Sequence, residues 1–174
     1  RIANFSLVDK NNFKGDLTPL ISCSENYYED LIKIYSKDEK VFEINSNSYL
    51  EIKGTGLLYL FVNNSCDLFL DFENLNIENF ETVFVKILLK ENVNLNLVTF
   101  DKGIIFKNLK IIESKNSQIN HIQFNLNGKF SLTEIKIFEN SKYVLNGLNL
   151  NNLYEFYNLN YSNHFASNSF SEMN

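Results

Sequence analysis

The chain has 174 residues, of which 44% are apolar, and a formal net charge of −5. This length fits a single domain, and the apolar content is too high for a disordered chain. Nucleic-acid-binding proteins need clustered Lys and Arg, whereas the 16 basic residues here are scattered along an acidic chain. Composition therefore favours one globular domain that does not bind nucleic acid.

The sequence carries no membrane-spanning or signal-peptide pattern. Its longest apolar run, Gly56–Val62, is far shorter than the ~20 residues of a transmembrane helix. Cys23 and Cys66 are the only cysteines, and they lack the spacing and the partners of a zinc site. We therefore expect a cytoplasmic protein that is not bound to a membrane, with both cysteines as buried free thiols.

The first 40 residues differ from the rest and contain one predicted helix. Ser22 followed three residues later by Glu25 matches a capping box, in which a hydroxyl and a carboxylate satisfy backbone N–H groups at a helix start. Apolar residues then recur every three or four positions, as on one helical face: Tyr27, Leu31, Ile34 and Tyr35. This pattern predicts a helix over 24–37, within an N-terminal segment that covers residues 1–40.

From Val41 onward apolar and polar residues alternate, which predicts strands with one buried face. The alternation is clearest in residues 92–97, 123–127 and 147–151. No second helical pattern follows, so residues 41–174 are predicted to form a core made of strands.

A sequence repeat runs through this part of the chain, since Asn92, Asn116 and Asn140 each follow a charged residue at a constant 24-residue step. Asn64 marks a fourth unit, at a slightly longer step before Asn92. The same 24-residue step aligns four apolar columns: Leu95, Ile119 and Tyr143; Phe100, Phe124 and Leu148; Phe106, Phe130 and Tyr154; and Ile111, Ile135 and Leu159. A period in this range is typical of solenoids, in which each coil stacks its side chains on the coil below.

The polar columns of the repeat favour the same fold. Lys115 falls between Glu91 and Glu139, and Lys110 falls beside Glu134. Opposite charges on neighbouring strands attract by ~0.2–1 kcal/mol per pair, and Asn at a fixed corner suits a tight turn because it tolerates left-handed backbone. We therefore predict a mostly β protein, a right-handed parallel β-helix with a short N-terminal helix. An antiparallel β-sandwich is the alternative, although it gives no reason for columns at this spacing.

A short solenoid has two open ends, each of which exposes unpaired backbone groups and a slice of apolar core. The predicted helix can cover one end. Residues 169–174 at the other end show no capping helix, so we expect strand addition to another chain there. The expected function is a non-catalytic scaffold that dimerises through solenoid strands. The alternative is a structural β-solenoid that self-assembles end to end.

Residues 90–172 resemble the β-helix core of the SufB/SufD family, scaffold subunits of a SUF-type complex for iron–sulfur cluster assembly. The coil openings at 91–95 and 115–119 are similar to the coil starts of that family. Asn146 and Gly147 match its Asn-Gly coil near the end of the core.

His164 adds to the resemblance, because hydroxyl residues follow it at plus five (Ser169) and plus seven (Ser171), as in the family. The resemblance implies a homo- or heterodimer with a SufB- or SufD-like subunit, docking to a SufC-type ATPase, and no cofactor held by this chain. Two features depart from the family. Tyr157 stands where the family has an Asp, and the C-terminal helical segment that docks SufC has no counterpart in this sequence.

The two histidines are the residues to weigh for metal binding. His164 is the one candidate metal ligand, but a structural histidine that forms hydrogen bonds near the last coil is the interpretation we favour. His121 aligns with Leu97 and Leu145 in the 24-residue frame, which predicts an inward or corner position. We therefore predict no metal site.

Asp67, Asp71 and Glu73 alternate along one strand and could form a catalytic acid pair. No base or nucleophile accompanies them, so we interpret them as a solvated face and predict no catalytic or cofactor-binding residues. A carbohydrate-active or surface-binding β-helix is a third possibility. It needs clustered acids or aromatic residues on one face, which the sequence does not reveal.

Overall fold

The computed structural model describes residues 5–8, 39–53, 56–74, 81–103, 105–126, 130–150 and 157–174. These residues form thirteen strands: β1 (Phe5–Val8), β2 (Glu39–Ile44), β3 (Ser48–Ile52), β4 (Gly56–Val62), β5 (Cys66–Asn74), β6 (Glu81–Leu89), β7 (Asn94–Gly103), β8 (Ile105–Glu113), β9 (Gln118–Leu126), β10 (Phe130–Ile137), β11 (Lys142–Leu150), β12 (Tyr157–His164) and β13 (Phe170–Met173). The predicted helix over 24–37 and Cys23 lie outside the described residues.

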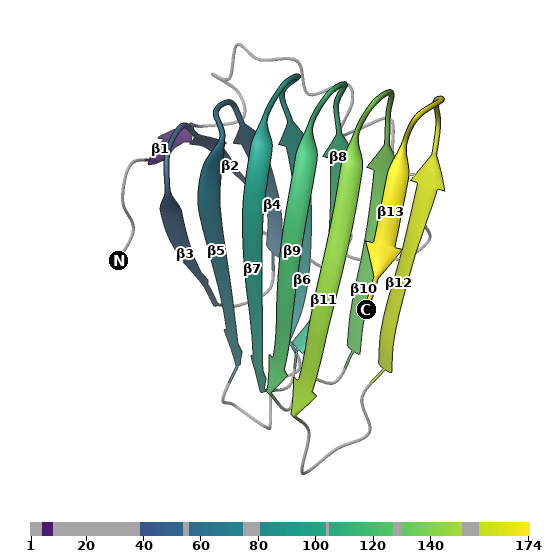
Figure 1. Ribbon diagram of the computed structural model, residues 1–174. Helices are drawn as coiled ribbons and strands as arrows, with labels where there is room; N and C mark the ends of the chain where they lie inside the picture. The colour runs from purple at the N-terminus through teal and green to yellow at the C-terminus, as the bar shows by residue number, and fades with distance from the viewer. Residues whose placement is uncertain are drawn as a thin grey trace.

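The strands form two sheets that face each other (Figure 1). Sheet A has the order β1-β2-β4-β6-β8-β10-β12, and sheet B has the order β13-β11-β9-β7-β5-β3. Every pairing is parallel except that of β1 with β2. The chain rises in the rear sheet and descends in the front sheet as it advances from left to right in Figure 1, so the coil is right-handed. The predicted right-handed parallel β-helix is confirmed.

The 24-residue step holds in the middle of the stack, from β6 to β10 and from β7 to β11. It aligns predicted apolar columns as register partners: Leu95, Ile119 and Tyr143; Phe100, Phe124 and Leu148; Phe106 and Phe130; and Ile111 and Ile135. Lys110 and Glu134 form an ion pair at 3.2 Å, and Lys115 and Glu139 form one at 2.9 Å. The charge pairing inferred from the repeat is therefore confirmed at these positions.

The coil length changes on both sides of this middle region. Phe130 pairs with Tyr157 instead of Tyr154, and Ile135 pairs with Ser162 instead of Leu159, so the last step in sheet A is longer than the repeat. The predicted column positions of Tyr154 and Leu159 are therefore wrong. Residues inserted in a connection outside the sheets cost little conformational entropy, so stacking constrains the strands but leaves the connections free to vary in length.

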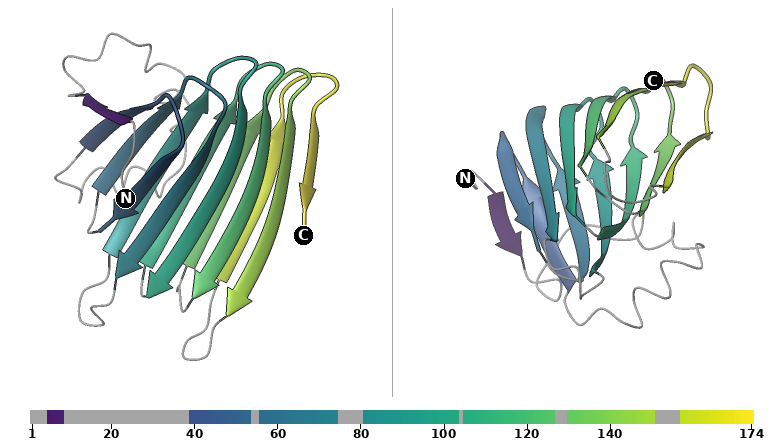
Figure 2. Two further views of the ribbon diagram at one scale, coloured as in Figure 1. Left: turned by 60° about the vertical axis from the view of Figure 1, so that its left-hand side comes forward. Right: turned by 90° about the horizontal axis from the view of Figure 1, so that it is seen from below.

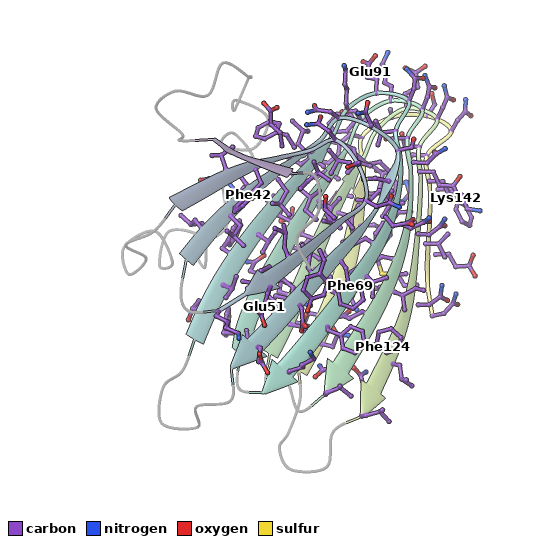
Figure 3. The ribbon with its side chains drawn as sticks, turned by 90° about the vertical axis from the view of Figure 1, so that its left-hand side faces the viewer. Phe42, Glu51, Phe69, Glu91, Phe124 and Lys142 are labelled. Atoms are coloured by element: carbon purple, nitrogen blue, oxygen red, sulfur yellow. The ribbon has the colours of Figure 1, made fainter. Side chains whose placement is uncertain are left out.

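The corners between sheet A and sheet B carry a ladder of asparagines. Asn92, Asn116, Asn140 and Asn168 have φ between 55° and 62°, in the left-handed region. From Asn116 onward, each donates a side-chain N–H to the Oδ1 of the asparagine one coil before, at 3.2–3.3 Å. Glu91, labelled in Figure 3, marks the row of corners. The left-handed backbone expected for the corner asparagines is confirmed.

Replacing Asn116 by Ala is expected to lower the free energy of unfolding by about 1–2 kcal/mol, because left-handed backbone costs an ordinary L-residue about that much. Asn116→Gly should cost less, since glycine adopts this conformation freely. The matched control is Asn120→Ala, which removes a 3.2 Å side-chain bond to Asn96 from a strand and should cost about 0.5 kcal/mol. Urea denaturation measures all three variants, and equal losses for Asn116→Ala and Asn120→Ala would contradict the explanation.

The hydrophobic core lies between the sheets. Aliphatic side chains from both sheets fill it, among them Leu70, Val85, Ile87, Leu97 and Ile111. Cys66 belongs to this core as a free thiol, and burial raises its pKa to about 11. The prediction of a buried free thiol is confirmed for Cys66. Among the described elements there is no helix with the length and hydropathy needed to cross a membrane.

Candidate functional site

The end coil, formed by β12 and β13, is the last layer of the stack (Figure 2). β12 pairs on one side only, with β10, and β13 covers only residues 142–145 of β11. Asn174 extends this cover, because its backbone N–H donates to the carbonyl of Leu145 and its carbonyl accepts from Gly147, both at 2.9 Å. Within the described part of the chain, the outer edge of β12 has no strand partner. Its backbone groups can therefore pair with a further strand.

Large apolar side chains project outward from the end coil. Leu159 is 56% exposed, Tyr161 39%, Phe165 55% and Phe170 48%, and we call these four the end-coil row. Phe165 stacks on Phe138 of the preceding coil with 5.6 Å between ring centroids, which holds its ring in place. Leu159 and Tyr161 lie on the outer face of sheet A, Phe165 follows at the corner, and Phe170 lies on the outer face of sheet B, so the row runs around the rim of the last coil. Exposed apolar groups around such a rim are typical of a protein-binding surface.

The inward positions of β12 are polar: Asn158, Asn160, Ser162 and His164. Ser162 is the register partner of Ile135 and His164 that of Ile137, so two apolar core columns end in polar side chains. On β13, Met173 is the register partner of Leu145 and packs, partly buried, against the core. The expected slice of apolar core is therefore small at this end, because a mainly polar layer closes it, and the larger exposed apolar groups lie on the outer surface.

His164 lies at the centre of a hydroxyl network in the end coil. Its Nδ1 is 2.7 Å from the Oγ of Ser169, and its Nε2 is 2.9 Å from the Oγ of Ser171, which in turn lies 2.7 Å from Ser162 Oγ. The two hydroxyls that resemble the SufB/SufD pattern thus bind the two ring nitrogens, in the hydrogen-bonded position expected of a structural histidine. Among the described residues, no three His, Cys, Asp or Glu side chains are grouped to hold a metal ion.

His121 lies in the interior between the sheets, as predicted, with Leu97 and Leu145 as register partners. Its Nε2 is 2.9 Å from the Oγ1 of Thr99, and its Nδ1 is 2.7 Å from the hydroxyl of Tyr143. Burial disfavours the imidazolium and lowers the pKa of His121 well below 6.5. The ring is therefore a neutral part of the core.

A buried ion pair, missed by the sequence analysis, joins the two sheets through the interior. Lys107 Nζ lies 2.6 and 2.8 Å from the two carboxylate oxygens of Asp101, and both side chains are almost fully buried. Gln123 links the pair to Ser131 through bonds of 3.3 and 3.0 Å. Burial lowers the pKa of Lys107, and the contact with Asp101 opposes that shift. Asp101 follows Leu97 by four residues on the same inward face of β7. This position in the alternation was the one feature of the sequence that could have indicated a buried carboxylate.

Glu113 is a second buried carboxyl group, at the end of β8 beside Ile137. Burial raises its pKa to about 8, and the backbone N–H of Lys142 offsets only part of the shift. Near neutral pH the side chain is therefore mostly protonated, which avoids a buried charge.

The three acids on β5 do not share one environment. Asp67 is exposed and Glu73 is half-buried, but Asp71 is only 6% exposed. Its Oδ2 accepts a hydrogen bond from the hydroxyl of Tyr49 and pairs with Lys102 at 2.8 Å. The bond to Asp71 is the main cause that raises the pKa of Tyr49 to about 12. The predicted solvated face is therefore wrong for Asp71, since Tyr49 and Lys102 hold it against the sheet.

An aromatic ladder runs over the outer face of sheet B, where Figure 3 labels Phe69 and Phe124. Tyr49, Phe69, Phe100 and Phe124 stack with 5.2, 5.3 and 4.6 Å between successive centroids. A groove of about 530 Å³ lies beside it, lined by Asn47, Ser48, Tyr49, Asp67, Leu68, Phe69, Asn96 and Val98. The sequence analysis missed the ladder because its members follow no single period.

Comparisons with protein-family models, with curated proteins and with solved structures found no match. A function for this chain has to be inferred from its own residues, and two surfaces qualify: the end coil and the groove on sheet B.

Proposed function

We propose that the protein is a non-catalytic scaffold that associates with a second β-solenoid chain through its end coil. The observation that carries this proposal is that the outer edge of β12 pairs with no described strand and lies next to the exposed end-coil row. Strand addition at such an edge supplies main-chain hydrogen bonds, and apolar side chains beside the edge supply buried area.

A second solenoid end fits this surface better than an isolated peptide. Stacked coils repeat at about 4.8 Å, so the end strand of a partner solenoid can lie beside β12 at the spacing of a continuous sheet. Outward residues Leu159 and Tyr161 alternate with inward polar residues along β12, so a strand paired with β12 would place its own outward side chains directly beside them on the outer face. An interface of this kind buries apolar groups without opening the polar layer beneath.

The resemblance to SufB/SufD suggests which partner to test first. It supports a SufB- or SufD-like subunit as the second solenoid, in a homo- or heterodimer, and iron–sulfur cluster assembly in the cytoplasm as the process served. A SufC-type ATPase is the further partner that this role implies.

Self-assembly into filaments is the competing proposal, and β1 weighs against it. Filament growth needs parallel strands at both ends of the stack. At the N-terminal end of sheet A, β1 pairs antiparallel with β2 over residues 5–8 and 41–44, which interrupts the parallel order. A closed pair of end coils therefore agrees better with the structure than an open filament.

The double substitution Leu159→Asp with Tyr161→Asp is expected to weaken association at least about 100-fold, because charges in the centre of an apolar interface are strongly unfavourable. Size-exclusion chromatography with mass detection, alone and after co-expression with the SufB-like subunit and SufC-like ATPase of the same organism, measures the effect. The control is Ile122→Asp, which charges an exposed apolar residue on sheet B and should leave the complex intact.

Two results would overturn the proposal. One is a wild-type chain that stays monomeric at high micromolar concentration with and without those partners. The other is equal disruption by Ile122→Asp, which would place the interface elsewhere. Polymers that lengthen with concentration would favour the filament instead.

A further inference from the structure

The groove on the outer face of sheet B crosses β3, β5 and β7 along the solenoid axis, at the opposite end of the stack from the end coil. Asn47, Asp67 and Asn96 lie in one row along the solenoid axis, and Tyr49, Phe69 and Val98 lie in the neighbouring row, as strand register shows. We call these rows the two walls of the groove. Its volume of about 530 Å³ lies within the ~300–1,000 Å³ range of small-molecule sites.

The polar wall offers both donors and acceptors of hydrogen bonds. Asn47 Oδ1 accepts from the backbone N–H of Asp67 at 2.9 Å, and Asp67 Oδ1 accepts from Asn96 Nδ2 at 2.8 Å. These bonds fix the wall while leaving Asp67 and Asn96 exposed. An amide carries two N–H groups and a carbonyl, and a carboxylate has further acceptor positions, so the wall can bind hydroxyl groups in either role.

Two contacts hold the rings of the apolar wall in place. The stacking of Tyr49 on Phe69 at 5.2 Å orients both rings, and Asp71 anchors Tyr49 through its hydroxyl. Together with Val98, the two rings give this wall an apolar surface on which the C–H groups of a ligand can pack.

The charge of the groove restricts the ligand further. Among the residues that the structure describes, Asp67 is the one charged residue that lines the groove, and no described Lys or Arg lines it. A polyanion would be repelled by Asp67, and the amides favour a neutral ligand. The ligand that combines many hydroxyl groups with C–H edges in a linear chain is a sugar polymer.

We propose that this groove binds a neutral oligosaccharide, with its hydroxyls on the wall of Asn47, Asp67 and Asn96 and its C–H groups on the wall of Tyr49, Phe69 and Val98. The groove crosses one strand every ~4.8 Å, a distance similar to one pyranose unit, so successive sugars meet successive coils. This binding is independent of the association proposed for the end coil, since the two surfaces share no residue.

Titration of the full chain with neutral hexasaccharides (cellohexaose, laminarihexaose, maltohexaose and chitohexaose) by calorimetry and by amide NMR tests the proposal. At least one is expected to bind saturably, with shifts centred on β3, β5 and β7. Asn96→Ala and Phe69→Leu should each weaken that binding about tenfold, the effect of losing one hydrogen bond or part of the apolar wall. Added salt should leave the affinity unchanged, because the ligand is uncharged.

The matched controls make the same kinds of change on the same face but outside the groove. Asn94→Ala changes an exposed amide two residues before Asn96 on β7, and Phe124→Leu changes a ring of the same aromatic stack as Phe69, but neither residue lines the groove. Both should bind within about twofold of wild type. Absence of saturable binding to every hexasaccharide, or equal losses in the controls, would overturn the proposal. Binding only to a sulfated oligosaccharide would also refute it.

Discussion

Replacing Asp101 by Asn is expected to lower the free energy of unfolding by about 3–5 kcal/mol, because it leaves the Lys107 ammonium buried without a counter-charge. Both side chains are almost fully buried and meet at 2.6 and 2.8 Å, so solvent cannot take over the role of the carboxylate. Asn is close in size to Asp and keeps an acceptor for Gln123, so the loss reports the charge and not a cavity. Urea denaturation at constant pH measures it.

The double variant Asp101→Asn with Lys107→Met is the control. Removing both charges together should recover most of the loss, since a buried ion pair contributes little net stability over uncharged groups of similar size. Two results would contradict this explanation: a loss of less than about 1 kcal/mol in the single variant, or a double variant that is no more stable than the single one. Either would show that burial of the Lys107 side chain does not require the charge of Asp101.

Glu113→Gln is expected to make the free energy of unfolding fall less as the pH rises. The folded-state pKa of Glu113 is about 8, above the ordinary value of 4.5, so the folded state holds this proton more tightly than the unfolded chain. The stabilisation is fully present below about pH 4.5 and is lost as pH rises towards 8, by about 1.4 kcal/mol per pH unit within that window. Above pH 8 the variant should therefore be more stable than the wild type.

The measurement is the free energy of unfolding of wild type and variant between pH 6 and 9, taken as a difference so that other titrating groups cancel. Thr133→Val serves as the control, because Thr133 is buried in the same interior and carries no titrating proton in this range. Its difference from wild type should not change with pH. A difference for Glu113→Gln that is equally flat would show that Glu113 is not protonated in the folded state.

The repeat made the central part of the fold predictable from sequence. Leu95, Ile119 and Tyr143 are register partners because each coil contacts only its neighbours, so a constant step in sequence becomes a constant step in space. The left-handed corner at Asn116 was predictable for a similar local reason, since few residues other than Asn and Gly adopt that backbone.

The end coil was predicted only in part. The sequence indicated an end that pairs with another chain, but the column positions of Tyr154 and Leu159 were wrong because the step to β12 is longer than the repeat. That shift decides which residues face inward. It places Ser162 and His164 on the core columns and Leu159 and Tyr161 outside, where they form the proposed interface.

By itself the sequence determined the fold class, the stacking register of the middle coils and the backbone of their corners, because these depend on interactions between residues one repeat apart. Only the tertiary structure decided which side chains meet across the interior or diagonally over a face. Asp101 and Lys107 are six residues apart on opposite sheets, and Asp71 and Lys102 are 31 apart on one face. Such contacts depend on the distance between the sheets and on the length of each connection, and neither quantity is encoded in the period of the repeat.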